Sequence, residues 1–421
     1  GYTSAASMRS LGPDRPLLIV TVLLVLFGLL MLYSAGQTDV PVLAAEGAWK
    51  RQLIWLGAGA ILAALVFRLS PRLLEWAALP LYVFSLALLA VTLVIGRGAG
   101  TAASSKSWIY IGGHAVGQPA ELAKIAVVLM LARYLSGGRE APASLRELVA
   151  PCLLAGVPAL LVLKQPDLGS ALVFGGILFA MLYWVGVKPS LLFMLASPVV
   201  SLLLAFTIWT WVTWMAILIT LMVIWRPYVA EAAAVAVLNA VMGFVAIPIW
   251  RRLEPYQQNR LLTFLNPEVD PQKAGYHAIQ SKVAIGSGGW FGNGFLEGPQ
   301  KRLAFLPAQH TDFIFSVVGE ELGFLGVLVA LLLFLIFFLV LLRIARRAVD
   351  PFSSLVVFGL TGLFGTHVFE NVGMTVNLMP ITGIPLPFFS YGGSFLLASS
   401  ISLGLVLRAA WDARLAGYVD V

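Results

Sequence analysis

Long apolar stretches of roughly twenty residues, separated by short polar segments, dominate this chain. A helix rising about 1.5 Å per residue needs about 20 apolar residues to cross a hydrocarbon core about 30 Å thick. The pattern predicts an all-α polytopic integral membrane protein, a helical bundle of ten to twelve transmembrane helices. Twelve candidate spans can be placed: 16–35, 53–68, 73–95, 120–135, 148–163, 168–187, 191–208, 211–225, 228–250, 313–342, 355–376 and 393–410.

The stretch 191–225 decides whether ten or twelve transmembrane helices are expected. Residues 191–225 include no charged side chain over 35 positions, and a single helix of that length would extend about 52 Å. The chain is therefore expected to fold back near the Trp209–Trp211 cluster, which gives an additional hairpin within 190–250. A chain of ten spans would instead need a tilted or re-entrant pass here.

The longest polar stretch, 251–312, is predicted to be a structured cap over a cavity. It contains NPEVDPQKAGYH, the glycine-rich AIGSGGWFGNGF and the apolar LAFLP, whereas a flexible linker would be rich in Ser and Pro and featureless. Glycines permit positive φ and close backbone approach. No GK[ST] follows the glycines and no βαβ pattern surrounds them, so no nucleotide site is expected.

The organisation that follows has five parts. They are a cytoplasmic N-terminal segment at 1–15, a transmembrane region at 16–250, a large extracytoplasmic loop at 251–312, C-terminal transmembrane helices at 313–410, and a cytoplasmic tail at 411–421.

Composition supports the membrane assignment and narrows the chemistry. The 421 residues are 60% hydrophobic and 11% charged, and the mean hydropathy is +0.92. A single cysteine, Cys152, excludes an intrachain disulfide and a CxxC motif. The formal charge of +7 comes from basic residues at segment ends rather than from a patch, so no nucleic-acid partner is expected.

The distribution of Lys and Arg predicts the orientation. Counting alternate sides of the predicted spans places fourteen basic residues on the N-terminal side and five in the short loops of the other side. The positive-inside rule then puts both termini in the cytoplasm. The loop 251–312 and the segment SYGG at 390–393 are consequently expected on the outer side.

The segment LPAQHTDFIF contains the most prominent carboxylate, Asp312. One reading is structural, because Asp312 or Thr311 would cap the helix that follows and accept its free N–H groups. The other is functional, because ionisable residues at membrane depth mark functional sites. His310 could then tune the carboxylate. The two roles are compatible.

Further polar residues recur on the same side. Glu121 and Lys124 in GQPAELAKI stand at i, i+3 on one helix face and can pair. A salt bridge that lets two charges enter the membrane is the structural alternative. In KQPDLGS, Lys164 and Asp167 lie between two spans, where Asp167 could simply cap a helix.

Two pairs lie inside apolar segments. In HVFENVG, His367 and Glu370 are expected to make a structural polar contact between helices. Glu320 and Glu321 lie two turns beyond Asp312, and one of them is expected to pack against a polar group of another span.

Four longer motifs, in order along the chain, resemble one known family. KQPDLGSALV, AGYHAIQSKVAIGSGG, LPAQHTDFIFSVVGEELG and NVGMTVNLMPITGIPLPFFSYGGS are similar to the SEDS family of shape, elongation, division and sporulation proteins. The resemblance implies a peptidoglycan glycosyltransferase that joins lipid II disaccharide units at the outer face of the bacterial cytoplasmic membrane. LEGPQKRLAFLPAQHTDF resembles the elongation (RodA) branch more than the division (FtsW) branch.

The resemblance also implies roles for individual residues. Asp312 matches the essential aspartate and is assigned as the catalytic general base. The implied substrate cavity comprises Glu121, Lys124, Asp167, Lys106, His310, Ser390, Tyr391, Gly392, Gly393 and Ser394. Two positions depart from the family pattern: Ser107 replaces a basic residue, with Lys106 adjacent, and Ala120 replaces the serine of QPSE.

Cofactor and partners follow from the same resemblance. The departing pyrophosphate of lipid II needs positive charge, from Lys124, Lys106 or a divalent cation, Mg²⁺ or Mn²⁺, at a site the sequence leaves unknown. The implied protein partners are a class B penicillin-binding protein, which is a transpeptidase, and elongation machinery proteins. A lipid II flippase and a non-enzymatic scaffold are the competing classes. No inverted repeat favours the flippase, and the scaffold predicts that Asp312 is dispensable.

Overall fold

The computed structural model of the chain describes residues 13–98, 106–112, 114–138, 140–253, 255–265, 274–306 and 308–419. Most of the predicted N-terminal segment, part of the 251–312 loop and the last two residues lie outside this range.

Long helices follow the twelve predicted spans. They are α2 (Arg15–Ala35), α3 (Ala48–Phe67), α4 (Pro71–Ile95), α5 (Pro119–Ser136), α6 (Leu145–Lys164), α7 (Leu168–Val185), α8 (Pro189–Leu204), α9 (Ile208–Trp225), α10 (Val229–Arg252), α14 (Ile314–Arg347), α15 (Pro351–Thr375) and α16 (Gly393–Val419). Within the described residues, ten helices are long and apolar enough to cross a membrane. The other two are α5, which contains Glu121 and Lys124, and α8, which has 16 residues. The predicted fold class is confirmed.

Several helices begin at a side-chain cap followed by proline. Asp14, Ser70 and Asp350 each accept the backbone N–H three residues on, at 3.1, 3.3 and 2.8 Å. Proline in the first turn lacks an N–H that would have no intrahelical partner. These local signals fix where the spans begin.

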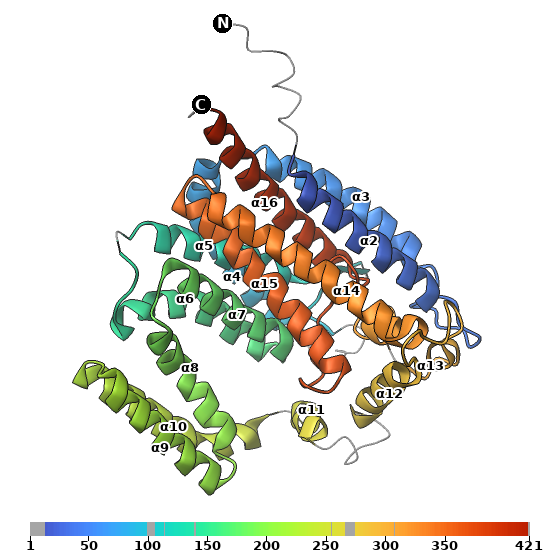
Figure 1. The fold of residues 1–421 in the computed structure, drawn as a ribbon. Coiled ribbons are helices and arrows are strands. Elements are labelled where there is room, and N and C mark those ends of the chain that lie inside the picture. The colour runs from blue at the N-terminus through green and yellow to red at the C-terminus, as the bar shows by residue number, and fades with distance from the viewer. Residues whose placement is uncertain are drawn as a thin grey trace, which may run out of the picture.

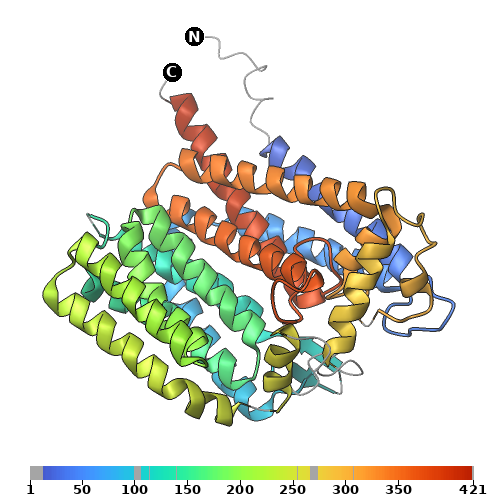
Figure 2. The ribbon, with the colours of Figure 1, turned by 60° about the horizontal axis from the view of Figure 1, so that its bottom comes forward.

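The long helices form a bundle in which α15 is central. It packs against α7, α14, α5 and α16, while α3 packs on α16 and α2 packs on α14. Figure 1 and Figure 2 show the start of α2 and the end of α16 at one end of the bundle, with α12 and α13 near the opposite end of α14. Residues 324–347 of α14, which follow a break at Gly323, form a helix about 36 Å long, which is enough to cross a hydrocarbon core about 30 Å thick.

The region 190–250, where an additional hairpin was predicted, forms three helices, α8, α9 and α10, which lie to one side of the bundle (Figure 1). The chain turns back at 205–207, beside the predicted cluster. Asn239 is the polar centre of this layer: it donates to Ser197 Oγ at 2.8 Å and accepts from Trp214 Nε1 at 3.3 Å. Polar contacts of this kind hold helices together where lipid gives no hydrophobic drive.

The loop 251–312 has its own structure, as predicted. It contains α11 (Pro255–Leu265), α12 (Ala274–Ser287) and α13 (Pro299–Arg302). An element that was not predicted is the short antiparallel hairpin of β1 (Ile109–Ile111) and β2 (His114–Gly117), which leads into α5. Its strands are too short to give an alternating pattern.

The glycine segment 288–294 clamps an interruption in α14. At Gly323 the backbone leaves the helical region, with φ 62° and ψ −160°. The carbonyls of Glu320 and Glu321 accept from the segment's Asn293 and Gly294, and Phe324 and Leu325 donate back to its carbonyls, at 2.8 to 3.2 Å. A Cβ at Gly292 would lie 2.0 Å from the Glu321 oxygen. Glycine is required there because the two backbones touch.

Helices α14 and α16 continue beyond the predicted ends at 342 and 410. Arg408 pairs with Asp412 at i, i+4, and Arg414 reaches Asp14 of α2 at 2.7 Å. These ion pairs stabilise the last turns of α16, which runs to Val419. The predicted tail is therefore largely a continuation of the last helix.

Candidate functional site

Asp312 lies in the turn 308–313 that precedes α14 and is only 5% exposed. Its backbone carbonyl accepts a hydrogen bond from Asn371 Nδ2 at 3.0 Å, and the same amide donates to the Ile384 carbonyl at 2.7 Å. Phe313 stands at the N-cap position of helix α14, and its side chain makes no capping hydrogen bond. The capping role of Asp312 or Thr311 stays a prediction.

His310 connects the Asp312 turn to the SYGG segment. Its carbonyl accepts from the Tyr391 N–H at 3.0 Å, and the two rings lie 5.9 Å apart. The Arg51 guanidinium lies 5.5 Å from the centre of the Tyr391 ring. Burial, helped by the positive charge of Arg51, lowers the pKa of His310 to about 4. His310 is consequently neutral at pH 7.

The SYGG segment is held from α3. Gln52 Nε2 donates to the Ser390 carbonyl at 3.0 Å, and Gln52 Oε1 accepts from the Gly392 N–H at 3.5 Å. Ser390 Oγ accepts from the Leu386 N–H at 2.9 Å. The predicted serine is thus engaged with the main chain, and Gly393 lies directly on the ring of Trp55.

Lys124 is fully buried and has two partners. Its ammonium group donates to Glu121 Oε1 at 2.8 Å and to His367 Nε2 at 3.1 Å. An ammonium group can only donate, so Nε2 is the acceptor and Nδ1 bears the proton that reaches the Pro385 carbonyl at 3.0 Å. The ring of Phe395 stacks on His367 at 4.2 Å. The predicted Glu121–Lys124 pair is confirmed.

Asp167 has the predicted cap and a second contact. One oxygen accepts from the Ser170 N–H at 3.0 Å, and the other accepts from Gln118 Nε2 at 2.9 Å. Gln118 immediately precedes α5, whose first turn contains Glu121. Lys106 is held nearby through its backbone N–H, which donates to the Gln165 carbonyl at 3.1 Å.

Helix α15 links these groups into one site. His367 contacts Lys124, and Asn371, one turn further on, contacts the backbone of Asp312. Side chains four residues apart on a helix lie about 5–6 Å from each other. Lys124 and the Asp312 backbone are therefore connected through α15, whereas Lys106 is exposed. His367 was predicted as a contact between helices, which is confirmed. Its place beside Lys124 was missed, although its i, i+4 spacing with Asn371 was a usable signal.

An apolar groove of about 390 Å³ runs from this region along the bundle. It is bounded by α3, α4, the β1–β2 hairpin, α5 and α16, and its polar lining comes from Gln118, Glu121 and Ser394. The remaining lining residues include Leu62, Leu88, Leu122, Ile125, Leu397 and Ile401. The site residue Glu121 therefore stands at a surface that an apolar chain can occupy.

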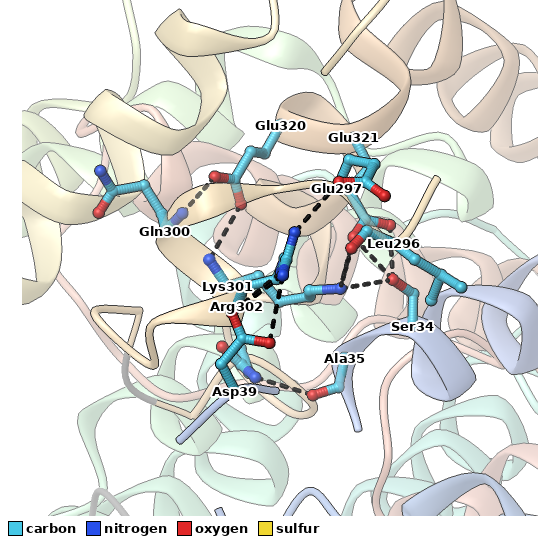
Figure 3. A network of polar contacts seen from close by, with 11 residues as sticks. Ser34, Ala35, Asp39, Leu296, Glu297, Gln300, Lys301, Arg302, Glu320 and Glu321 are labelled. Carbon is cyan, nitrogen blue, oxygen red and sulfur yellow. Dashed lines mark hydrogen bonds and ion pairs between the residues drawn. The ribbon is translucent and has the colours of Figure 1, made fainter. Parts of the chain in front are cut away.

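A second buried ion pair holds the chain that leads to Asp312 (Figure 3). Lys301 Nζ lies 2.8 Å from Glu321 Oε1, and both side chains are fully buried. Ser34 Oγ donates to Glu321 at 2.6 to 2.7 Å and accepts from Lys301 at 3.1 Å. The prediction that one glutamate of α14 packs against a polar group of another span is confirmed by Glu321.

The neighbouring glutamate, Glu320, adds hydrogen bonds between α14 and α13. Glu320 accepts the backbone N–H groups of Gln300 and Lys301, at 2.6 and 3.2 Å, at the start of α13. Further along, Gln309 Nε2 donates to the Ala35 carbonyl at 2.8 Å. The chain from α13 to Asp312 is therefore attached to α14 through Gln300 and Lys301 (Figure 3) and to α2 through Gln309.

No cluster of three or more His, Cys, Asp or Glu side chains suited to a metal ion occurs among the residues that the structure describes.

The fold and this site define a polytopic helical membrane protein with a buried, charged site near one end of an apolar bundle. The profile of the FtsW/RodA/SpoVE family, described as cell cycle proteins, matches residues 14–415. The chain belongs to this family.

Individual relatives agree over nearly the whole chain. The peptidoglycan glycosyltransferase RodA of Treponema pallidum is 37% identical over 94% of this chain and 96% of its own length. A probable peptidoglycan glycosyltransferase FtsW of Trichlorobacter lovleyi is 35% identical over 96% and 94%. A solved chain from a peptidoglycan synthase complex, studied for the coordination of polymerization and crosslinking, superposes with a TM-score of 0.70 at 32% identity. It covers 96% of this chain and 98% of that one.

Proposed function

We propose that this protein is a peptidoglycan glycosyltransferase of the RodA type, which polymerises lipid II in the bacterial cytoplasmic membrane. The observation that carries the proposal is the near-full-length match to relatives named for that activity, in a chain where a buried carboxylate, a buried cation and an apolar groove lie together. The first named relative is a RodA, which favours elongation over the division role of FtsW.

Asp312 is the general base of this reaction. The 4-hydroxyl of a GlcNAc attacks the anomeric carbon of a MurNAc, the new C–O bond forms with inversion, and the bond to the pyrophosphate-polyprenol breaks. The hydroxyl proton passes to the Asp312 carboxylate. A positioned base contributes about 10²- to 10⁴-fold to such a step. The hydrogen bond from Asn371 to the Asp312 backbone supports this role, because it fixes the main chain beside the carboxylate.

Lys124 supplies positive charge to the departing pyrophosphate. Its ammonium group is already desolvated and oriented by Glu121 and His367, so it needs no reorganisation when charge develops. The groove beside Glu121 is suited to the polyprenyl chain of the substrate. A divalent cation, Mg²⁺ or Mn²⁺, at the pyrophosphate would add to this positive charge.

The site belongs at the outer face. Asp312 precedes α14, while Arg346 and Arg347 lie in its last turn. Positive side chains favour the cytoplasmic side. Both termini are therefore cytoplasmic, and lipid II is used where its disaccharide is exposed outside.

The partner is a class B penicillin-binding protein that crosslinks the glycan, with other elongation proteins around it. The similar solved chain comes from a synthase complex in which polymerization and crosslinking are coordinated, and this likeness supports such a pairing.

The test is polymerisation of purified lipid II by the protein with its cognate partner, comparing wild type with Asp312→Ala. Asp39→Ala is the matched control, because Asp39 is an exposed carboxylate of an outer loop. We expect glycan strands from wild type and the control, and a loss of about 10²-fold or more in Asp312→Ala.

Both variants must be folded and bound to the partner. Equal polymer from Asp312→Ala would remove Asp312 as the base and leave the scaffold role open. No polymer from wild type, combined with lipid II translocation in vesicles, would favour the flippase.

A further inference from the structure

A second polar pocket lies at the other end of α14 from Asp312, between the start of α2 and the ends of α14 and α16. It measures about 170 Å³ and is formed by the start of α2, the end of α14 and the last turns of α16. Its lining residues are Asp14, Arg343, Ile344, Arg347, Ala410, Ala413 and Arg414.

The single carboxylate of this pocket is already neutralised. Asp14 is 5% exposed. It accepts from Arg343 at 2.7 and 2.8 Å, from Arg414 at 2.7 Å, and from the Leu17 N–H at 3.1 Å. Three guanidinium groups against one carboxylate leave the lining with two net positive charges. The pocket therefore attracts an anion.

Hydrogen-bond donors remain for such an anion. A guanidinium group has five N–H donors, and Arg343 uses only Nη2 in its contacts with described residues. Arg347 is exposed and lines the same pocket. Its guanidinium makes no hydrogen bond or ion pair with any residue in the described part of the chain.

We propose that this pocket binds the phosphate group of an anionic phospholipid. The pocket lies at the ends of membrane-spanning helices, the level of lipid headgroups, where basic pockets between helices recognise such groups. Arginine pairs with phosphate through two parallel N–H···O bonds. The lining also has an apolar part, formed by Ile344, Ala410 and Ala413. It can contact the glycerol and acyl carbons of a lipid, whereas free phosphate has no carbon atoms for it to contact.

The test measures retention of phosphatidylglycerol by the full-length protein in detergent, by native mass spectrometry during a lipid titration. Wild type is compared with Arg347→Ala, and Arg346→Ala is the matched control. Arg346 is the adjacent exposed arginine that does not line the pocket. Each basic residue near a membrane surface contributes about 1 kcal/mol, so Arg347→Ala is expected to weaken binding about fivefold. Arg346→Ala should bind as wild type does.

Two further arms identify the ligand. Phosphatidylcholine, which has the same chains and no net charge, should bind more weakly than phosphatidylglycerol. Inorganic phosphate should not displace the lipid at millimolar concentration. Equal losses in the two arginine variants would show a diffuse surface effect and overturn the site. Equal binding of the two lipids, or displacement by inorganic phosphate, would overturn the assignment to an anionic lipid.

Discussion

Two buried lysine–glutamate pairs lie near the same end of this protein, and they differ in what surrounds them. Lys301–Glu321 is sealed: both side chains are fully buried, and Ser34 satisfies the remaining oxygen. Lys124–Glu121 is open on one side, because Glu121 lines the apolar groove. The Lys301–Glu321 pair therefore holds a loop, whereas one member of the other pair, Glu121, contacts the groove. The position of Glu121 at the groove, rather than pairing itself, separates the two pairs.

The largest expected effect comes from breaking the sealed pair. Lys301→Met leaves the Glu321 charge buried without its cation, which should lower the free energy of unfolding by about 3–5 kcal/mol. Replacing both residues, as Lys301→Met with Glu321→Met, removes the buried charge and should restore most of that loss. Thermal unfolding in detergent measures both. A double variant as unstable as the single one would contradict a purely local pair.

Breaking the open pair should cost less stability and more activity. In Lys124→Met, Glu121 keeps access to the groove, so the free energy of unfolding should fall by only about 1–3 kcal/mol. Lipid II polymerisation should fall about 100-fold, because the pyrophosphate loses a preorganised cation. Melting temperature and polymerisation are measured on the same preparation. A loss of stability as large as that of Lys301→Met, with activity per folded molecule retained, would remove the distinction between the pairs.

The smallest expected effect is a pH dependence of stability that comes from His310, next to the Asp312 turn. The folded pKa of His310 is about 4, below its usual 6.5, because burial and Arg51 oppose its protonation. The neutral His310 ring therefore makes its full contribution to the free energy of unfolding above pH 6.5. That contribution is lost as the pH falls toward 4. Stability at pH 6 should be about 1 kcal/mol lower than at pH 8. His310→Gln should remove this difference in a pH series of melting temperatures, and an unchanged pH profile would refute the assignment.

The spans were predictable because each membrane helix satisfies its own backbone, so its signal is local in sequence. Even the hairpin of α8 to α10 follows from one uncharged stretch. The far ends of α14 and α16 were not predicted. Arg414 is paired with Asp14, at the opposite end of the chain, and no periodicity reports such a contact.

The contacts of the candidate site also divide into local ones, which the sequence predicted, and long-range ones, which it did not. Glu121 and Lys124 are three residues apart, and Asp167 caps its own helix, so spacing alone predicted both contacts. The partnership of Lys124 with His367 joins residues 243 positions apart. The Lys301–Glu321 pair depends on how the loop folds back on α14. Non-local pairs of this kind need the packed structure.

The interruption of α14 at Gly323 has a consequence for how the protein opens. Glu320 and Glu321 before the break and Phe324 and Leu325 after it are all hydrogen-bonded to the glycine segment. Regions that share hydrogen bonds unfold together as one cooperative unit. Amide hydrogen exchange at Phe324 and Leu325, whose N–H groups donate to this segment, should therefore follow the opening of the loop rather than that of the membrane core.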